Sequence, residues 1–535
     1  MRTWQCSRRH MADLVAIIFT VCTNVFVWKT PFRDHGRMPG DFGDPMWNLF
    51  SLEHLYRSVK FEESFWNPQY LWPLKGVGAF SDTHLGSGLF YIAPRLFGLG
   101  MFDSYRVWYI IGIIASSISA YLASRFIRMR PLSASVVGIV YGCSFPITAQ
   151  IGHAQLIHRW AAPWALVMCV PIIATRFRLY DRILVFTVAI TLQFLCNSGL
   201  AIGTVLLALP IALSSSFWRD HKTNIKPQGT ILNKSCRVVT YLILLLGGYV
   251  AATYYFFQLR YHLSRQPSEI WGYSPTFKSL FFADHSRIWA GWSSKLFFFG
   301  GRWEVQMFLG LMLIVLAGIS VVFQSKYWGL SLVSLLSALS MVLLIVRIGD
   351  SSIFIKIAEL PGFSSVRTPA RFWLIALFPI GLMAGIGIEA IVQKHSRLSR
   401  VLASLLIALM VYEYGAVELS SQSEDDYFSS VYKLQSEIDI AIDLNPEKQY
   451  KAFLFRDNEN NSQDFTAFLT AQFMRFPTLN GAMEGIPYSL LTAGTCSEAK
   501  KFVDSALLFS SEMTNEKIDA KSNEVLIVGC QDAAG

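Results

Sequence analysis

The stretch Met11-Ala-Asp-Leu-Val-Ala-Ile-Ile-Phe-Thr-Val-Cys-Thr-Asn-Val-Phe-Val-Trp28 is mostly apolar with a single charged residue, and similar runs recur as far as Gly415. About 20 apolar residues are enough for a helix to cross a hydrocarbon core of about 30 Å. The sequence therefore predicts an all-α polytopic membrane protein. Arginines precede the first run as in a signal peptide, but no small-x-small cleavage site follows, so we expect a retained anchor.

The formal net charge of +9 does not indicate a nucleic-acid partner. The basic residues lie in short loops between apolar runs, whereas a nucleic-acid surface gathers them on one face. The eight cysteines form no Cys-x-x-Cys pair and no metal-ligand spacing. Only Cys496 and Cys530 lie in the polar tail, where an oxidising compartment would allow them to form a disulfide.

Windows of about 20 residues predict about eleven transmembrane helices. The Asn197-Ser198-Gly199 segment divides a region that is too long for one helix, so we expect two short helices there. The expected spans are residues 11–28, 104–125, 131–149, 157–175, 181–196, 199–217, 238–259, 306–323, 328–346, 371–392 and 400–416.

Basic residues in short loops predict the orientation, because Lys and Arg are retained on the cytoplasmic side. With a cytoplasmic amino terminus, the inner loops carry arginines and lysines at 125–130, 176–182, 222–237 and 394–400. Residues 1–416 then form the membrane domain, with long outer segments at 29–103, 260–305 and 347–370. Residues 417–535 form a small extracytoplasmic α/β domain of a protein in the bacterial cytoplasmic membrane.

The segment Gly40-Asp41-Phe42-Gly43-Asp44-Pro45 places two acids close together near the predicted membrane surface. A carboxylate there could take a proton from an acceptor hydroxyl or hold Mg²⁺ or Mn²⁺, with Asp44 as the metal ligand. Helix capping also explains Asp44, and an Asx turn explains Asp41. The following residues, 46–59, are expected to form an amphipathic helix in the interface, and the apolar patch at 85–97 is too short for a span.

Three further groups of polar residues stand at predicted span ends. Asp82 and His84 come just before the apolar patch at 85–97, and Gly152-His153-Ala154-Gln155 is followed by His158 and Arg159. Such residues bind substrate in many membrane proteins, but helix caps and interfacial snorkelling explain them as well.

Arg367 and Arg371 lie four residues apart before the tenth predicted span. The guanidinium fork suits a phosphate at the headgroup level. Anchoring to lipid headgroups is the alternative.

These motifs occur in a particular order along the chain: Gly-Asp-x-x-Asp-Pro at 40–45, Ser-Asp-x-His at 81–84, Gly-His-x-Gln at 152–155 and Val-Arg-x-Pro-Ala-Arg-Phe at 366–372. Together with the spans and the outer tail, this order resembles the bacterial polytopic glycosyltransferases of the GT-C fold, especially the YfhO-like membrane proteins. The resemblance implies transfer of a sugar, with inversion, from a polyprenyl-phosphate donor to a glycan or protein acceptor at the outer face of the membrane.

The resemblance also implies roles for individual residues. Asp44, or else Asp41, would be the catalytic or metal-binding acid, and Arg367 and Arg371 would bind the lipid phosphate. The two acids here are separated by two residues, unlike the adjacent acidic pairs of several GT-C branches. Two other functions are open: a transporter or flippase of lipid-linked glycans, and a noncatalytic envelope assembly protein.

Overall fold

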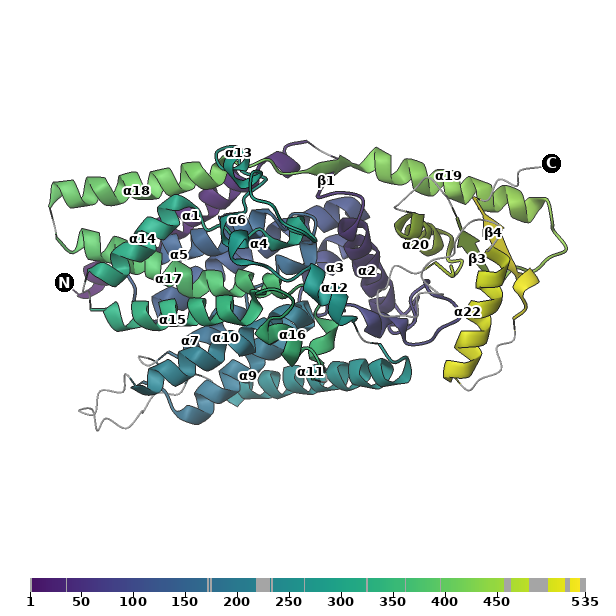
Figure 1. The fold of residues 1–535 in the computed structure, drawn as a ribbon, viewed down its shortest axis with the longest axis horizontal. Coiled ribbons are helices and arrows are strands. Elements are labelled where there is room, and N and C mark those ends of the chain that lie inside the picture. The colour runs from purple at the N-terminus through teal and green to yellow at the C-terminus, as the bar shows by residue number, and fades with distance from the viewer. Residues whose placement is uncertain are drawn as a thin grey trace. The chain divides into compact units, whose positions relative to one another are not determined.

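The computed structural model describes residues 2–34, 36–170, 173, 176–217, 231, 234–263, 265–323, 326–360, 362–394, 396–456, 463–480, 499–514 and 520–529 (Figure 1). The chain divides into two compact units. Unit 1 comprises Met1–Arg33, Tyr109–Gly248 and Pro267–Leu419, and unit 2 comprises Asp34–Trp108, Tyr249–Gln266 and Ser420–Gly535. The predicted division into residues 1–416 and 417–535 stays a prediction.

Helix α17 (Trp373–Val392) is the centre of unit 1, and nearly all of its residues are buried. It packs against α5 (Pro131–Cys143), α14 (Leu311–Val322) and α15 (Trp328–Ile345), as Figure 1 shows. Glycines allow this close packing: a Cβ at Gly387 would lie 2.1 Å from the backbone oxygen of Leu316. Small residues at such contacts are typical of helices that associate in membranes.

The predicted break in the 181–217 region is confirmed. One residue, Asn197, separates helix α9 (Leu179–Cys196) from helix α10 (Ser198–Phe217). Between them, the Oδ1 atom of Asn197 accepts a hydrogen bond from the backbone N–H of Leu200 at 2.8 Å. The side chain thus caps the first turn of α10.

Eight helices in the described residues are long and apolar enough to cross a membrane. Two more expected spans, 199–217 and 306–323, correspond to apolar helices that are shorter than this limit, and the described part of 157–175 contains only the seven-residue α7 (Ala162–Met168). The count of eleven is therefore not confirmed. The eight candidates are His10–Trp28, Met101–Phe126, Pro131–Thr148, Leu179–Cys196, Ser235–Arg260, Trp328–Ile345, Pro369–Val392 and Arg397–Gly415.

Two short sheets lie in unit 2. Strand β1 (Arg37–Pro39) pairs antiparallel with β2 (Ser421–Ser423), so the first outer segment and the tail are joined. Strand β3 (Ala452–Phe455) pairs parallel with β4 (Val525–Val528), with Phe453 opposite Leu526. The described tail therefore contains a small parallel strand pair packed with helices.

Helices from the first outer segment and from the tail pack together in unit 2. Helix α2 (Asp44–Val59) contacts α20 (Gln463–Met474) and α3 (Leu89–Leu96). Phe50 and Leu55 of α2 are buried, so protein covers most of the apolar stripe that the sequence assigned to the membrane interface. The interfacial prediction for α2 is corrected: its apolar face is part of a protein core.

The remaining helices complete the two units. They are α1 (Arg2–Trp28), α4 (Met101–Phe126), α6 (Phe145–Thr148), α11 (Lys234–Arg260), α12 (Pro267–Gly272), α13 (Ala290–Ser293), α16 (Ile353–Ile357), α18 (Arg397–Gly415), α19 (Glu424–Asp443) and α22 (Ala499–Thr514).

Candidate functional site

A cluster of charged residues in unit 1 converges on Glu304. This acid lies in the short helix η5 (Arg302–Val305), and Arg371 lies in η7 (Pro369–Phe372) just before α17. The Nε and Nη2 atoms of Arg371 donate to the two carboxylate oxygens at 3.2 and 2.8 Å. Arg367 donates to Oε1 at 3.3 Å, and the Nε2 atom of His153 lies 3.2 Å from the same oxygen. Three of the predicted substrate-binding residues are thus brought together by one acid.

The carboxylate of Glu304 is completely buried. Burial alone would raise its pKa, but the charges of Arg371, His153 and Arg367 hold the pKa well below its usual range. Glu304 is therefore ionised at neutral pH. The side chains of Arg367 and Arg371 keep 23% and 20% of their surface exposed, so both guanidinium groups are within reach of a ligand from outside.

The surroundings of Glu304 hold the two arginine-bearing segments in place. Val305 and Ala370, neighbours of Glu304 and Arg371, pack together with Phe282 in a small apolar core. The guanidinium of Arg367 lies over the ring of Tyr273 at 4.7 Å. The segments that carry Glu304 and Arg371 thus share one small core.

His158 and Arg159 lie elsewhere in unit 1 and are buried. Arg159 donates through Nη2 to the backbone oxygen of Tyr141, in the last turn of α5, and its charge lies 4.7 Å from the Tyr141 ring. A cation at this end of a helix is favourable because the carbonyl groups there carry partial negative charge. The geometry favours a structural role for Arg159. Gln155 lies in the short helix η3 (Ala154–Leu156), next to the loop that carries His153.

The two predicted catalytic acids lie in unit 2. The Oδ1 atom of Asp41 accepts a hydrogen bond from the backbone N–H of Gly43 at 3.0 Å, which is the Asx turn that the sequence left open. Asp44 is the first residue of α2, and the N-cap position is occupied by Gly43. An acid in the first turn stabilises a helix through its dipole. Both acids therefore have local structural roles, and their catalytic roles stay predictions.

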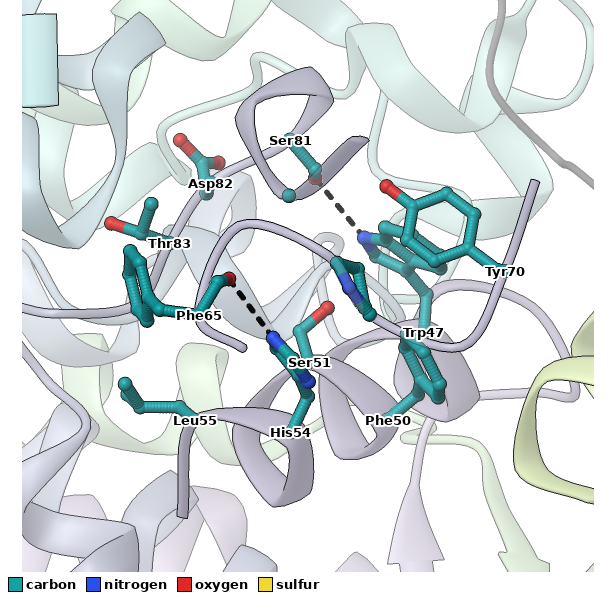
Figure 2. A pocket seen from close by; sticks show the side chains of 12 residues that line it. Trp47, Phe50, Ser51, His54, Leu55, Phe65, Tyr70, Ser81, Asp82 and Thr83 are labelled. Atoms are coloured by element: carbon teal, nitrogen blue, oxygen red, sulfur yellow. Dashed lines mark hydrogen bonds between the residues drawn. The ribbon is translucent and has the colours of Figure 1, made fainter. Parts of the chain in front are cut away.

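A small cavity in unit 2 lies beside α2 (Figure 2). Trp47 lies one helical turn beyond Asp44, and its indole N–H donates to the hydroxyl of Ser81 at 3.1 Å. Asp82, one of the predicted substrate-binding residues, is also among the lining residues. The lining consists of Trp47, Phe50, Ser51, His54, Leu55, Phe65, Pro68, Tyr70, Gly78, Ser81, Asp82 and Thr83.

His84 follows this cavity lining but is itself buried. Its ring meets Trp108 edge to face, with centroids 5.6 Å apart. Burial lowers the pKa of His84 to about 4, so the imidazole is neutral at pH 7. Its backbone oxygen accepts hydrogen bonds from Ser87 and Gly88, which makes it part of a turn before α3.

Two of the buried acids, Glu304 and Glu53, were not predicted as site residues from the sequence. Glu53 lies in α2 and binds Arg95 of α3 through two hydrogen bonds of 2.9 and 3.0 Å. Glu304 stands between Trp303 and Val305, whereas Glu53 stands between Leu52 and His54. The apolar neighbours of Glu304 were the available signal, because an acid buried among apolar residues needs a partner.

The described residues do not supply an obvious metal site. No group of three or more His, Cys, Asp or Glu side chains within these ranges is arranged to hold a metal ion. The role of Asp44 as a metal ligand stays a prediction. Cys496 and Cys530, the predicted disulfide candidates, lie outside the described residues.

No protein-family model matches the sequence, and no curated protein matches it. Among solved structures, the arabinofuranosyltransferase AftD from Mycobacteria is similar in fold, with a TM-score of 0.51 and 12% identity. The match covers 95% of this chain and 33% of AftD, so the chain spans about a third of that protein. A mutant form of AftD matches at a TM-score of 0.50, with 12% identity over 95% of this chain and 35% of the other.

The oligosaccharyltransferase of Archaeoglobus fulgidus also matches, at a TM-score of 0.48 and 13% identity over 92% of this chain and 68% of its own. The likeness to AftD concerns the fold alone, because the sequence identity is low. Together with the eight candidate spans, it supports the expected GT-C-like polytopic membrane fold. The relation to YfhO-like proteins stays a prediction.

Proposed function

We propose that this protein is a membrane glycosyltransferase that moves a sugar from a polyprenyl-phosphate donor to a cell-envelope acceptor at the outer face of the cytoplasmic membrane. The observation that carries the proposal is the convergence of Arg367, Arg371 and His153 on Glu304, just ahead of the apolar helix α17. The fold likeness to an arabinofuranosyltransferase adds support, although one fold can host many activities.

In this proposal Arg367 and Arg371 bind the phosphate of the donor. Arg371 gives one edge of its guanidinium, Nε and Nη2, to Glu304, which leaves the hydrogens of Nη1 unused by that carboxylate. A guanidinium held in this way can point its remaining donors at an anion without first losing rotational freedom. The positive charge then stabilises the phosphate as the bond to the sugar breaks.

The proposed transfer needs one acid to activate the acceptor. The acceptor hydroxyl oxygen bonds to the anomeric carbon, and its proton passes to a carboxylate, with Asp44 as the first candidate and Asp41 as the second. The bond between the anomeric carbon and the phosphate oxygen breaks, and the polyprenyl phosphate leaves with the electron pair. Attack opposite to the leaving group inverts the anomeric carbon.

The first experiment tests transfer by protein reconstituted in lipid with a panel of radiolabelled polyprenyl-phosphate sugars. We expect wild type to release sugar from at least one donor, and we expect Asp44→Asn to abolish release. Arg371→Lys should keep the charge but lose the fork geometry, and should weaken donor binding. Arg287→Gln is the matched control, because Arg287 forms an exposed ion pair with Glu418.

Two outcomes would contradict the enzyme. Binding of donor without release of sugar would favour the transporter or flippase. Absence of both binding and release across the panel, with folded protein, would favour the noncatalytic assembly protein. Loss of release in Asp41→Asn but not in Asp44→Asn would move the role of the base to Asp41.

A further inference from the structure

Helix α3 has one apolar face that the described residues of unit 2 leave uncovered. Leu89, Leu96 and Phe97 expose 67%, 62% and 86% of their surface, respectively. Leu89 and Leu96 are seven residues apart and so share one side of the helix, with Phe97 beside them at its end. Large exposed apolar residues gathered on one helix face mark a surface that meets another apolar phase.

The opposite face of α3 carries its polar groups and is fixed to α2. The hydroxyl of Tyr91 donates to the carboxylate of Glu53 at 2.6 Å, and Arg95 holds the same carboxylate with two hydrogen bonds. Arg95 also lies over the ring of Tyr56 at 4.8 Å. The one charged side chain of α3 therefore points into the protein, and the exposed face is left apolar.

The chain reverses directly after α3 and enters a candidate membrane span. Gly98 adopts a positive φ of 92°, and the backbone N–H of Leu99 donates to the oxygen of Pro94, which closes the helix end. Helix α4 begins three residues after Gly98, at Met101. Four residues extend over at most about 14 Å, so the exposed face of α3 stays close to the first turn of α4.

Helix α4 is long enough for its first turn to lie at the membrane surface. Its 26 residues correspond to about 39 Å of helix, which exceeds the roughly 30 Å hydrocarbon core. One end of α4 can therefore reach the headgroup layer. With eight residues, α3 itself extends only about 12 Å and cannot cross the membrane.

We propose that α3 is an in-plane membrane helix that rests its Leu89, Leu96 and Phe97 face on the lipid of the bilayer surface. Because the contacts to Glu53 join α2 to α3, the position of α3 on the membrane then also fixes the distance of α2 from the membrane. The sequence analysis assigned an interfacial role to residues 46–59, whereas the exposed apolar face belongs to 89–97. This inference goes beyond the proposed sugar transfer and does not depend on it.

The test uses the full chain in liposomes of phosphatidylcholine and phosphatidylglycerol, with no donor present. The photoreactive residue p-benzoylphenylalanine is placed at the position of Phe97, of Leu89 or of Leu444. Leu444 is the matched control, because it is a similarly exposed apolar residue that caps α19. After irradiation, mass spectrometry should show several-fold more phospholipid adduct at 97 and 89 than at 444.

A second measurement uses the unaltered protein and so does not depend on how the variants fold. Hydroxyl-radical oxidation of wild type in nanodiscs that hold one copy each should spare Phe97 and Leu96 relative to Leu444. Equal lipid labelling at 97 and 444, or equal oxidation, would overturn the proposal. A crosslinked dimer in place of lipid adducts would overturn it too, because a second copy would then cover this face.

Discussion

Glu53 in unit 2 and Glu304 in unit 1 are both buried carboxylates that each contact two arginines. The two pairs of arginines differ in their other hydrogen-bond partners. Glu53 binds Arg95 and Tyr91 closely, with Arg57 at 3.6 Å. Glu304 binds Arg371 and Arg367, with His153 at 3.2 Å. The two clusters share their chemistry and allow a direct comparison.

The difference lies in what else the arginines bind. Arg57 also donates to the backbone oxygen of Gln472 and to Glu63, and Arg95 donates to the backbone oxygen of Leu99 at 2.7 Å. Within the described residues, the side-chain hydrogen bonds of Arg371 all go to Glu304. Arginines that also bind other parts of the protein brace the fold, whereas an arginine side chain that binds one acid alone keeps donors that a ligand can use. This difference favours a bracing role for Glu53 and agrees with the proposed binding of a ligand by the Glu304 cluster.

The largest expected effect is that of Glu53→Gln on folding. The change removes the buried charge that faces Arg95 and Arg57, two partly buried arginines, and breaking a buried ion pair costs about 3–5 kcal/mol. We expect a much lower yield of folded protein and faster proteolysis of unit 2. Sugar release per folded molecule should be unchanged, and a large loss of release at full stability would break the comparison.

Arg371→Lys should act on function more than on folding. Lysine keeps the charge near Glu304 but cannot form the fork, and a charge-assisted hydrogen bond contributes about 1.5–3 kcal/mol. Donor binding should therefore weaken by roughly tenfold or more, as measured by the donor concentration at half-maximal sugar release. Arg95→Lys is the matched control in unit 2. If it weakens donor binding as much as Arg371→Lys does, the two clusters are not functionally distinct.

Local sequence signals predicted the local parts of the structure. The break at Asn197 was predicted because polar residues stand there between two apolar runs. The capping hydrogen bond at this break joins residues that are only three positions apart in the sequence. Arg367 and Arg371 were found because their spacing and their place before a span are visible in the chain. Structural features that depend only on residues close together in the sequence can be predicted without knowledge of the fold.

Long-range partners were not predictable in the same way. Glu304 lies 67 residues before Arg371, and no pattern in the sequence links the two. The interfacial prediction for α2 was wrong because α20, more than 400 residues later, covers its apolar face: the amide of Gln472 donates to the backbone oxygen of Phe50. A stripe of apolar residues shows that a face is buried, but not whether lipid or protein buries it.

The pH dependence of stability tests whether the charge of Glu304 stabilises the folded protein. Its folded-state pKa lies well below the ordinary value of 4.5, so its contribution is present above that value and is lost as the pH falls below it. Unfolding measured between pH 6 and about 3 should show wild type losing stability toward low pH. Glu304→Gln should flatten this loss. An unchanged slope would mean that the carboxylate charge is not held by its partners.

Asp284 is the control for that measurement, because Arg302 binds it in the same outer segment. Burial would raise the pKa of Asp284, but hydrogen bonds from Arg302, Ser293 and Gln306 lower it from 3.8 to about 2. Its contribution is therefore lost between those two values. Asp284→Asn should change the curve only in this lower window and should leave the loss that begins near pH 4.5 intact.

The smallest expected effect is that of Arg287→Gln on stability. Arg287 and Glu418 are paired at 3.4 Å, but both side chains are largely exposed, and water and salt screen such a pair. The free energy of unfolding should change by less than about 0.5 kcal/mol, and sugar release should stay as in wild type. A larger loss would show that charge pairing alone, without burial, contributes to stability here. Glu53 and Glu304 are expected to matter because they are buried, and their roles are expected to differ because their arginines have different numbers of unused donors. Such a result would contradict the first of these expectations.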